Sequence, residues 1–145
     1  MDLSALKAKY SEINEAAITL TIPLLWGDMD SARHVNNIVY LRWTETARIQ
    51  LFHKMMDTSF REKGPILGWH DCKYILPMTF PDTAVVSMKV DQILEDRFIL
   101  EGRIYSQKHK KIAAISKQSI IPYDYVKLRK TELPEEWKTK LISFS

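Results

Sequence analysis

The segment 26–37, WGDMDSARHVNN, gathers two aspartates, an arginine, a histidine and two asparagines. An alternating apolar run precedes it and a run without Gly or Pro follows, so we expect the segment to join a strand to a long helix. The first turn of a helix carries unpaired backbone N–H groups and partial positive charge. A substrate carbonyl placed there is polarised, because donors already point to where oxyanion charge develops. A nearby carboxylate can then serve as base or nucleophile.

Thioester hydrolysis is a reaction that a site with this small number of groups can catalyse. The leaving thiol has a pKa of about 8.5, so it departs with little or no protonation. One carboxylate and one or two N–H donors therefore suffice. The residue types alone also fit an ordinary polar turn, because Asp commonly forms turns before helices. They do not choose between Asp28 and Asp30.

Hydrophobic periodicity predicts the elements that position this segment. Helical spacing predicts a short amphipathic helix at Leu3–Ile13, and strict alternation predicts a half-buried strand at Ala17–Leu24. The run Asn37–Met56 is expected to form a helix of roughly 30 Å, with Asn36 as its N-cap.

The second half of the chain has the patterns of strands. After a loop at Gly64-Pro65, we expect strands at Gly68–Leu76, Thr83–Leu94, Arg97–Ser106 and Lys111–Ile121. Their short connections indicate antiparallel neighbours, and a terminal helix is expected to start within Leu133–Trp137. One long helix against a five-stranded antiparallel sheet is an α+β domain, and the length predicts a single domain over residues 1–145.

The long helix is expected to have a polar and an apolar side. A helical wheel places the polar residues on one arc: Arg42, Thr46, Gln50, His53 and Lys54. Opposite them lie Ile38, Leu41, Leu51, Phe52, Met55 and Met56. Glu45 and Arg48 fall inside the apolar half, three residues apart, and are expected to pair. This pair is either structural or part of a pocket.

Composition argues against several classes of protein. The net charge of +3, from 21 basic and 18 acidic residues, is too small to indicate nucleic-acid binding. No apolar run reaches the ~20 residues of a membrane span, and the N-terminus lacks the pattern of a secretory signal. The single cysteine, Cys72, excludes an internal disulfide and is compatible with a reducing compartment, so we expect a cytoplasmic protein.

Other catalytic motifs are absent from the sequence. Its four glycines are isolated, so phosphate-binding loops are not expected, and no Gly-x-Ser-x-Gly elbow occurs. His70 and Cys72 share a strand face, but two ligands make a poor metal site, and we expect neither metal nor cofactor. Cys72 is expected to be a small buried residue rather than a nucleophile. The basic run Lys108–Lys111 is expected to be a solvated turn, with a phosphate contact as the alternative.

Several motifs resemble one known family. Asp30-x-x-x-His34-Val35-Asn36-Asn37-x-x-Tyr40, followed by Glu45-x-Ala47-Arg48, looks like the hot-dog-fold acyl-CoA thioesterases, in particular the 4-hydroxybenzoyl-CoA thioesterase-like branch. Weaker support comes from Tyr74-Ile75-Leu76-Pro77 through Asp82-Thr83, and from Ile121-Pro122 and Leu133-Pro134-Glu135-Glu136. The resemblance covers nearly the whole chain from Ile18 onward. It implies a hot-dog fold, in which a five-stranded antiparallel sheet wraps one long helix.

The resemblance also implies roles for individual residues. It makes Asp30 the catalytic carboxylate and Asn37 the source of a backbone N–H that polarises the thioester carbonyl. His34 matches a catalytic histidine of the related plant acyl-carrier-protein thioesterases, but those enzymes have an asparagine where this chain has Ala32. Asp30 is therefore the main candidate and His34 the second. Whether Asp30 acts as general base or as nucleophile stays open at this point.

Substrate contacts follow from the same resemblance. Asn36, Tyr40 and Glu45 are expected beside the substrate; for Tyr40, packing in the core is the alternative. The implied substrate is a thioester of CoA or of acyl carrier protein. The implied assembly is a homodimer or homotetramer with the active site between subunits, which also agrees with the tendency of unpaired sheet edges to pair.

Two alternatives to this enzyme are open. One is a non-catalytic hot-dog module that binds acyl-CoA as a sensor or scaffold. The other is a hydratase or dehydratase of the same fold, whose Asp-x-Asn-x-x-His pattern is poorly met by Asp30, Ala32 and Val35.

Overall fold

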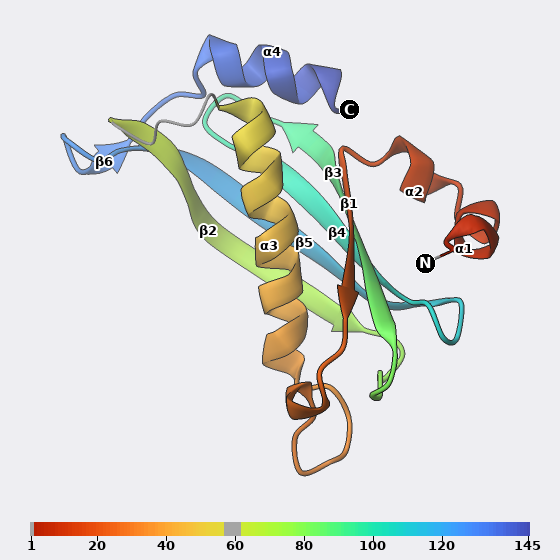
Figure 1. The fold of residues 1–145 in the computed structure, drawn as a ribbon. Helices are drawn as coiled ribbons and strands as arrows, with labels where there is room; N and C mark the ends of the chain where they lie inside the picture. Colours follow the sequence, from red (N-terminus) through yellow and green to blue (C-terminus); the bar gives the residue numbers. More distant parts are fainter. Residues whose placement is uncertain (1, 57–61) are drawn as a thin grey trace.

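In the computed structural model, which describes residues 2–56 and 62–145, a curled antiparallel sheet packs one face against a long helix (Figure 1). The helix α3 spans Asn37–Met55 and follows the short 3-10 turn η1, Trp26–Asp28. The strands are β1 Ile18–Pro23, β2 Lys63–Tyr74, β3 Thr83–Ile93, β4 Phe98–Ser106 and β5 Lys111–Asp124. They lie in the order β1-β3-β4-β5-β2, and the two-residue β6, Arg129–Lys130, pairs with β5.

Most of the expected elements are confirmed. Helix α3 starts at the expected residue, and the Asn36 side chain caps it by accepting a hydrogen bond from the Ile38 N–H at 3.0 Å. Strands β3, β4 and β5 match their expected ranges closely, and the terminal helix α4 spans Glu135–Ser143. Local periodicity and capping chemistry therefore suffice to locate these elements.

Two of the expected local structures were wrong. The single helix expected at Leu3–Ile13 is two short helices, α1 at Ser4–Lys9 and α2 at Glu12–Glu15. The chain leaves the helical conformation at Tyr10, whose ring packs on Tyr105 with 5.0 Å between centroids, so a tertiary contact outweighs helix continuity.

Gly64-Pro65, expected in a loop, lies inside β2. Because β2 is at the edge of the sheet, a residue without an N–H is tolerated there, and Pro65 lies opposite Pro122 of β5.

The core lies between α3 and the concave face of the sheet. The expected polar arc of α3 is exposed, and Tyr40, Trp43, Ala47, Leu51 and Phe52 are buried. Ile38 departs from its expected burial, because 60% of its surface is exposed, and Leu41 is only half-buried. The apolar arc is wider than the area the sheet covers, so its margin remains open beside β2.

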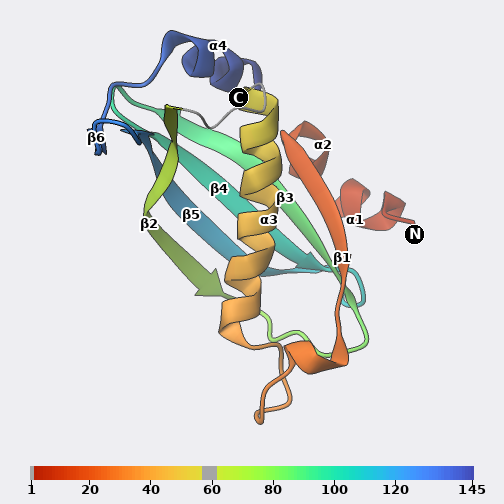
Figure 2. The same ribbon diagram turned by 60° about the vertical axis from the view of Figure 1, so that its left-hand side comes forward.

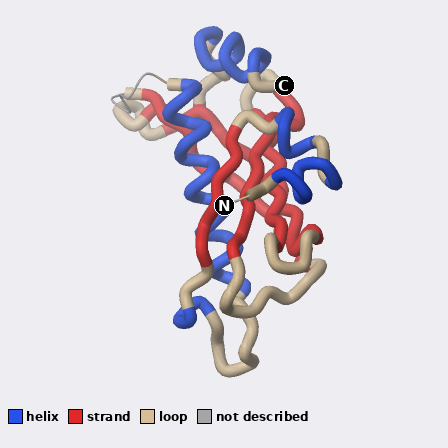
Figure 3. The backbone as a smooth tube through the Cα atoms, turned by 45° about the vertical axis from the view of Figure 1, so that its right-hand side comes forward, coloured by secondary structure: helices blue, strands red, loops and turns tan. Residues whose placement is uncertain are grey.

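The two ends of the chain extend the core differently. Helix α4 crosses the end of the sheet where α3 ends (Figure 2). Its Trp137 and Leu141 are buried in the same core. Helices α1 and α2 lie on the other side of the sheet from α3 (Figure 3), where Leu6 and Ile13 pack on Val85 and Tyr105. Within the described ranges, no helix is long and apolar enough to cross a membrane.

Candidate active site

Asp28 holds the segment between β1 and α3 together. Its Oδ2 accepts a hydrogen bond from the Leu25 N–H at 2.8 Å, and its backbone oxygen accepts one from the Asn36 N–H at 2.9 Å. The side chain thus closes η1 while the backbone fixes the residue that caps α3. These contacts describe a structural residue.

Asp30 lies in a tight turn that leaves part of its carboxylate open. Its Oδ1 accepts the Ala32 N–H at 2.9 Å, and its backbone bonds to the Arg33 N–H and the His34 oxygen close the turn. Arg33 has a φ of 64°, in the left-handed region that is uncommon for residues other than glycine. Among the described residues, no donor bonds to Oδ2 of Asp30, and the residue is exposed.

The start of α3 offers an open backbone donor. The Asn36 side chain accepts a hydrogen bond from the Ile38 N–H, and the backbone oxygen of Asn36 accepts one from the Val39 N–H at 2.9 Å. The Asn37 N–H, which precedes these two, has no acceptor in the part of the chain that the structure describes. The positive end of the 19-residue helix therefore presents one N–H that a ligand oxygen can accept.

Asp30 and Asn37 border two separate cavities within one chain. Asp30 lines a cavity of about 630 Å³, together with Trp26, Met29, Ser31, Arg33, Thr79 and Phe80. Asn37 lines one of about 230 Å³, together with Val35, Tyr40, Tyr74, Ile75, Leu76 and Pro77. The fold brings both residues to the entrance of α3, where each lines a different cavity.

Tyr40 and Tyr74 form the aromatic wall beside Asn37. The Tyr40 hydroxyl accepts the Met78 N–H at 3.2 Å, and the Tyr74 hydroxyl donates to the Asn37 oxygen at 3.1 Å. The two rings meet edge to face, with centroids 5.2 Å apart. Burial raises the pKa of Tyr40 and raises that of Tyr74 to about 12, so both phenols are protonated at neutral pH. Sequence reasoning gave Tyr74 no role, because its contact with Asn37 joins positions 37 residues apart.

A third cavity, of about 260 Å³, lies farther along α3 toward β2. It is lined by Ile38, Leu41, Arg42, Glu45, Arg48, Leu67 and His70. The expected pair is present, with Arg48 Nη2 at 3.6 Å from Glu45 Oε2, and the pair also borders this pocket. The Glu45 side chain is largely exposed, whereas that of Arg48 is buried. This burial lowers the pKa of the Arg48 guanidinium.

The remaining candidates are placed as follows. His34 is exposed at the tip of the Asp30 turn, and its side chain bonds to none of the described residues. Cys72 is half-buried, and burial raises the pKa of its thiol, which disfavours the thiolate that a nucleophile needs. The described residues contain no group of three or more His, Cys, Asp or Glu side chains arranged to hold a metal ion.

A family model described as the thioesterase-like superfamily matches residues 24–141. No curated protein matches the chain. Among solved structures, the chain is similar to the PA2801 protein of Pseudomonas aeruginosa, with 27% identity and a TM-score of 0.75 over 83% of this chain and 95% of that one.

Two further solved structures share the fold at lower identity. A 1,4-dihydroxy-2-naphthoyl-CoA thioesterase from Synechocystis has 17% identity and a TM-score of 0.74, covering 86% of this chain and 94% of its own. A gentisyl-coenzyme A thioesterase has 17% identity and a TM-score of 0.75, covering 86% of this chain and 99% of its own.

Proposed function

Because this chain belongs to the thioesterase-like superfamily, we propose that it hydrolyses an acyl-CoA, or an acyl-carrier-protein thioester, to a free acid and a thiol. Its curled five-stranded sheet around one long helix is the hot-dog fold, as expected from the sequence. Two of the similar structures are named as thioesterases of aromatic CoA esters. The observation that carries the proposal is the open Asn37 N–H, seven residues after a carboxylate with an open oxygen.

In the proposed mechanism, the thioester carbonyl accepts a hydrogen bond from the Asn37 N–H. Charge that develops on this oxygen is stabilised by the positive end of α3. Asp30 either activates a water that attacks the carbonyl carbon or attacks it directly, with a transient anhydride that water then hydrolyses. In both routes the C–S bond breaks and the thiolate leaves. Asn36 supports this geometry by capping the helix, and Tyr40 and Tyr74 form the wall beside the carbonyl.

We place the complete site between two copies of the chain. No strand of the described residues pairs with the outer edge of the 12-residue strand β2, and its Trp69 and Tyr74 are 54% and 45% exposed. Beside them, Ile38 and Ile49 of α3 are 60% and 40% exposed. A second copy that pairs its own β2 with this edge would cover these side chains and extend the sheet.

Light scattering at micromolar concentration tests this assembly. We expect a homodimer or homotetramer, and Trp69→Lys should shift it toward the monomer, because a charge then enters the buried contact. A wild-type monomer would contradict the assembly but leave the chemistry of Asp30 open to the next experiment.

The decisive experiment for the function is a hydrolysis screen with short, medium, long and aromatic acyl-CoAs. Asp30→Asn keeps an oxygen for the Ala32 N–H but removes the charge, so kcat/KM should fall at least about 100-fold while Tm is unchanged. Asp28→Asn makes the same change two residues away and should retain activity. Wild-type hydrolysis by Asp30→Asn would refute its role, and tight binding of acyl-CoA without product release by the wild type would favour a sensor or scaffold.

A further inference from the structure

The side of α3 that faces β2 is only partly covered by the described residues, since Ile38 is 60% and the Glu45 side chain 62% exposed while Arg48 is buried. Ile38, Leu41, Glu45 and Arg48 recur on this side at the spacing of one helical face. The 260 Å³ cavity lies between them and Leu67 and His70 of β2. It starts one residue after Asn37 and runs along the helix, so that Glu45 is about 12 Å from Asn37 along the axis.

The cavity contains a buried cation with spare hydrogen-bond donors. Arg48 is only 7% exposed, and its Nη1 donates to Gln118 Oε1 at 2.8 Å. A guanidinium has five N–H donors, and this is the single hydrogen bond that the described residues make with it. The Glu45 carboxylate, at 3.6 Å from Nη2, is too distant for a hydrogen bond and is 62% exposed.

The inner partners of Arg48 are themselves fixed. Gln118 is fully buried and donates to Ser116 Oγ at 3.3 Å, and Ser116 donates to the Asp71 oxygen at 2.7 Å. This chain of bonds holds one edge of the guanidinium against β5. The other edge borders the cavity. Among the described residues, the fully buried side-chain atoms without a partner are Gln107 Oε1 and Ser119 Oγ, so the unbonded nitrogens of Arg48 are not fully buried and can be reached by an acceptor.

We propose that this cavity receives the far end of the acyl group, and that Arg48 donates a hydrogen bond to an oxygen carried there. This inference rests on the proposed function and specifies its substrate class: acyl groups with a hydroxyl, keto or carboxylate oxygen remote from the thioester. Ile38, Leu41 and Leu67 contact the carbon skeleton, while Arg42 adds a second positive charge at the rim. An acyl group with a plain hydrocarbon end would leave the guanidinium without an acceptor.

The test compares acyl-CoAs that differ in a single remote hydroxyl group, in straight-chain and aromatic series. Hydrogen bonds to a charged group favour the oxygenated member, so wild-type kcat/KM should be about tenfold to a hundredfold higher for it in at least one pair. Arg48→Met removes the donor and should bring this ratio toward one. A wild-type ratio near one in every pair, or an unchanged ratio in Arg48→Met, overturns the inference.

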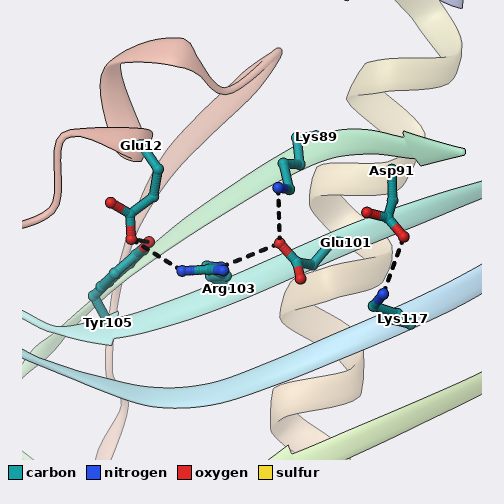
Figure 4. Close-up of polar contacts among 7 residues, drawn as sticks. All are labelled: Glu12, Lys89, Asp91, Glu101, Arg103, Tyr105 and Lys117. Atoms are coloured by element: carbon teal, nitrogen blue, oxygen red, sulfur yellow. Dashed lines mark hydrogen bonds and ion pairs between the residues drawn. The ribbon is translucent and has the colours of Figure 1, made fainter. Parts of the chain in front are cut away.

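Arg103→Met is the matched control. Arg103 is partly buried on the opposite face of the sheet, where it pairs with Glu12 and Glu101 (Figure 4). Its loss should leave the ratio between the paired substrates unchanged. Where Arg48→Met does not fold, Glu45→Gln serves instead: it removes the competing carboxylate, so the ratio should rise a few-fold, and a ratio that stays the same counts against the inference.

Equilibrium binding separates this inference from the proposed function. Calorimetry with the free acids needs no turnover, and the hydroxylated acid should bind wild-type protein about tenfold tighter than the plain acid. Tighter binding of the hydroxylated acid without any hydrolysis would support the proposed role of the cavity and refute the thioesterase activity. Hydrolysis with equal binding of the two acids would support the activity and overturn the role of Arg48.

Discussion

The start of α3 and the outer face of the sheet both concentrate polar groups, but in opposite states. On the outer face, Arg103 lies 3.0 Å from Glu12 and 3.2 Å from Glu101, and Lys89 lies 3.4 Å from Glu101 (Figure 4). At the start of α3, Asp30 Oδ2 and the Asn37 N–H have no partner among the described residues. The outer charges satisfy one another, whereas the groups at the helix entrance remain available to a ligand.

The outer network has a structural explanation. Lys89, Glu101 and Lys117 face one another across β3, β4 and β5 in the strand register, and Lys117 also lies 3.0 Å from Asp91. Glu12 extends the network to α2 and so ties the N-terminal helices to the sheet. Cross-strand pairs of opposite charge stabilise a sheet modestly. The comparison teaches that charge density alone does not indicate a site, while open donors and acceptors at a helix start do.

The largest effect should come from Asn37→Pro. Proline is favoured at the first position of a helix, and Asn36, with φ −60° and ψ 139°, already has the conformation that precedes a proline. The substitution therefore removes the open N–H while α3 persists, and kcat should fall about 10²–10³-fold, as for loss of an oxyanion-hole donor.

Asn37→Ala is the control, because it removes the side chain and keeps the N–H. Steady-state kinetics compares kcat of the two variants, and circular dichroism checks that the helix is retained in both. Equal activity in the proline and alanine variants would mean that this N–H does not bind the carbonyl.

Asp28→Ala should affect stability more than chemistry. It removes the acceptor for the Leu25 N–H, a loss comparable to that of a helix cap, so the free energy of unfolding should fall by about 0.5–2 kcal/mol. Denaturant unfolding measures this change. If Asp28→Ala lost as much kcat/KM as Asp30→Asn at unchanged stability, the assignment of the two aspartates would be reversed.

Arg103→Met should have a smaller effect, confined to stability. The side chain is partly solvated, so loss of its ion pairs should lower the free energy of unfolding by about 1 kcal/mol or less. The difference from wild type should shrink in high salt, which screens exposed pairs. A large loss of hydrolysis in this variant would show that the two regions are coupled.

The smallest effect concerns Asp124, another satisfied carboxylate. Hydrogen bonds from the Lys127 and Val126 N–H groups, at 2.8 and 2.9 Å, hold the pKa of Asp124 below its usual value. A lowered folded-state pKa stabilises the protein above the unfolded pKa of about 3.9, and this contribution is lost as pH falls through the folded value. Asp124→Asn should therefore be slightly less stable than wild type at neutral pH, with a difference that disappears in acid. The measurement is the Tm of both proteins as a function of pH. A difference in Tm that stays constant with pH would mean that the charge of Asp124 does not contribute to stability.

The sequence by itself determined the local features of this protein. The extent of α3, its Asn36 cap and strands β3 to β5 follow from periodicity and capping, which depend on residues within a few positions of one another. The order of the motif residues from Asp30 to Asn37 was enough to propose a thioester site. Its two aspartates received different roles through the family resemblance, and the hydrogen bonds of Asp28 agree with a structural one.

Only the tertiary structure decided the features that join distant parts of the chain. The contact of Arg48 with Gln118 spans 70 residues, and that of Tyr74 with Asn37 spans 37. The exposure of Ile38 and Leu41 beside β2 depends on how far the sheet curls around α3. A helical wheel carries no information about that curvature. Side-chain spacing specifies a face of an element, but which partner covers that face, and which donors remain open, is settled by strand order and packing.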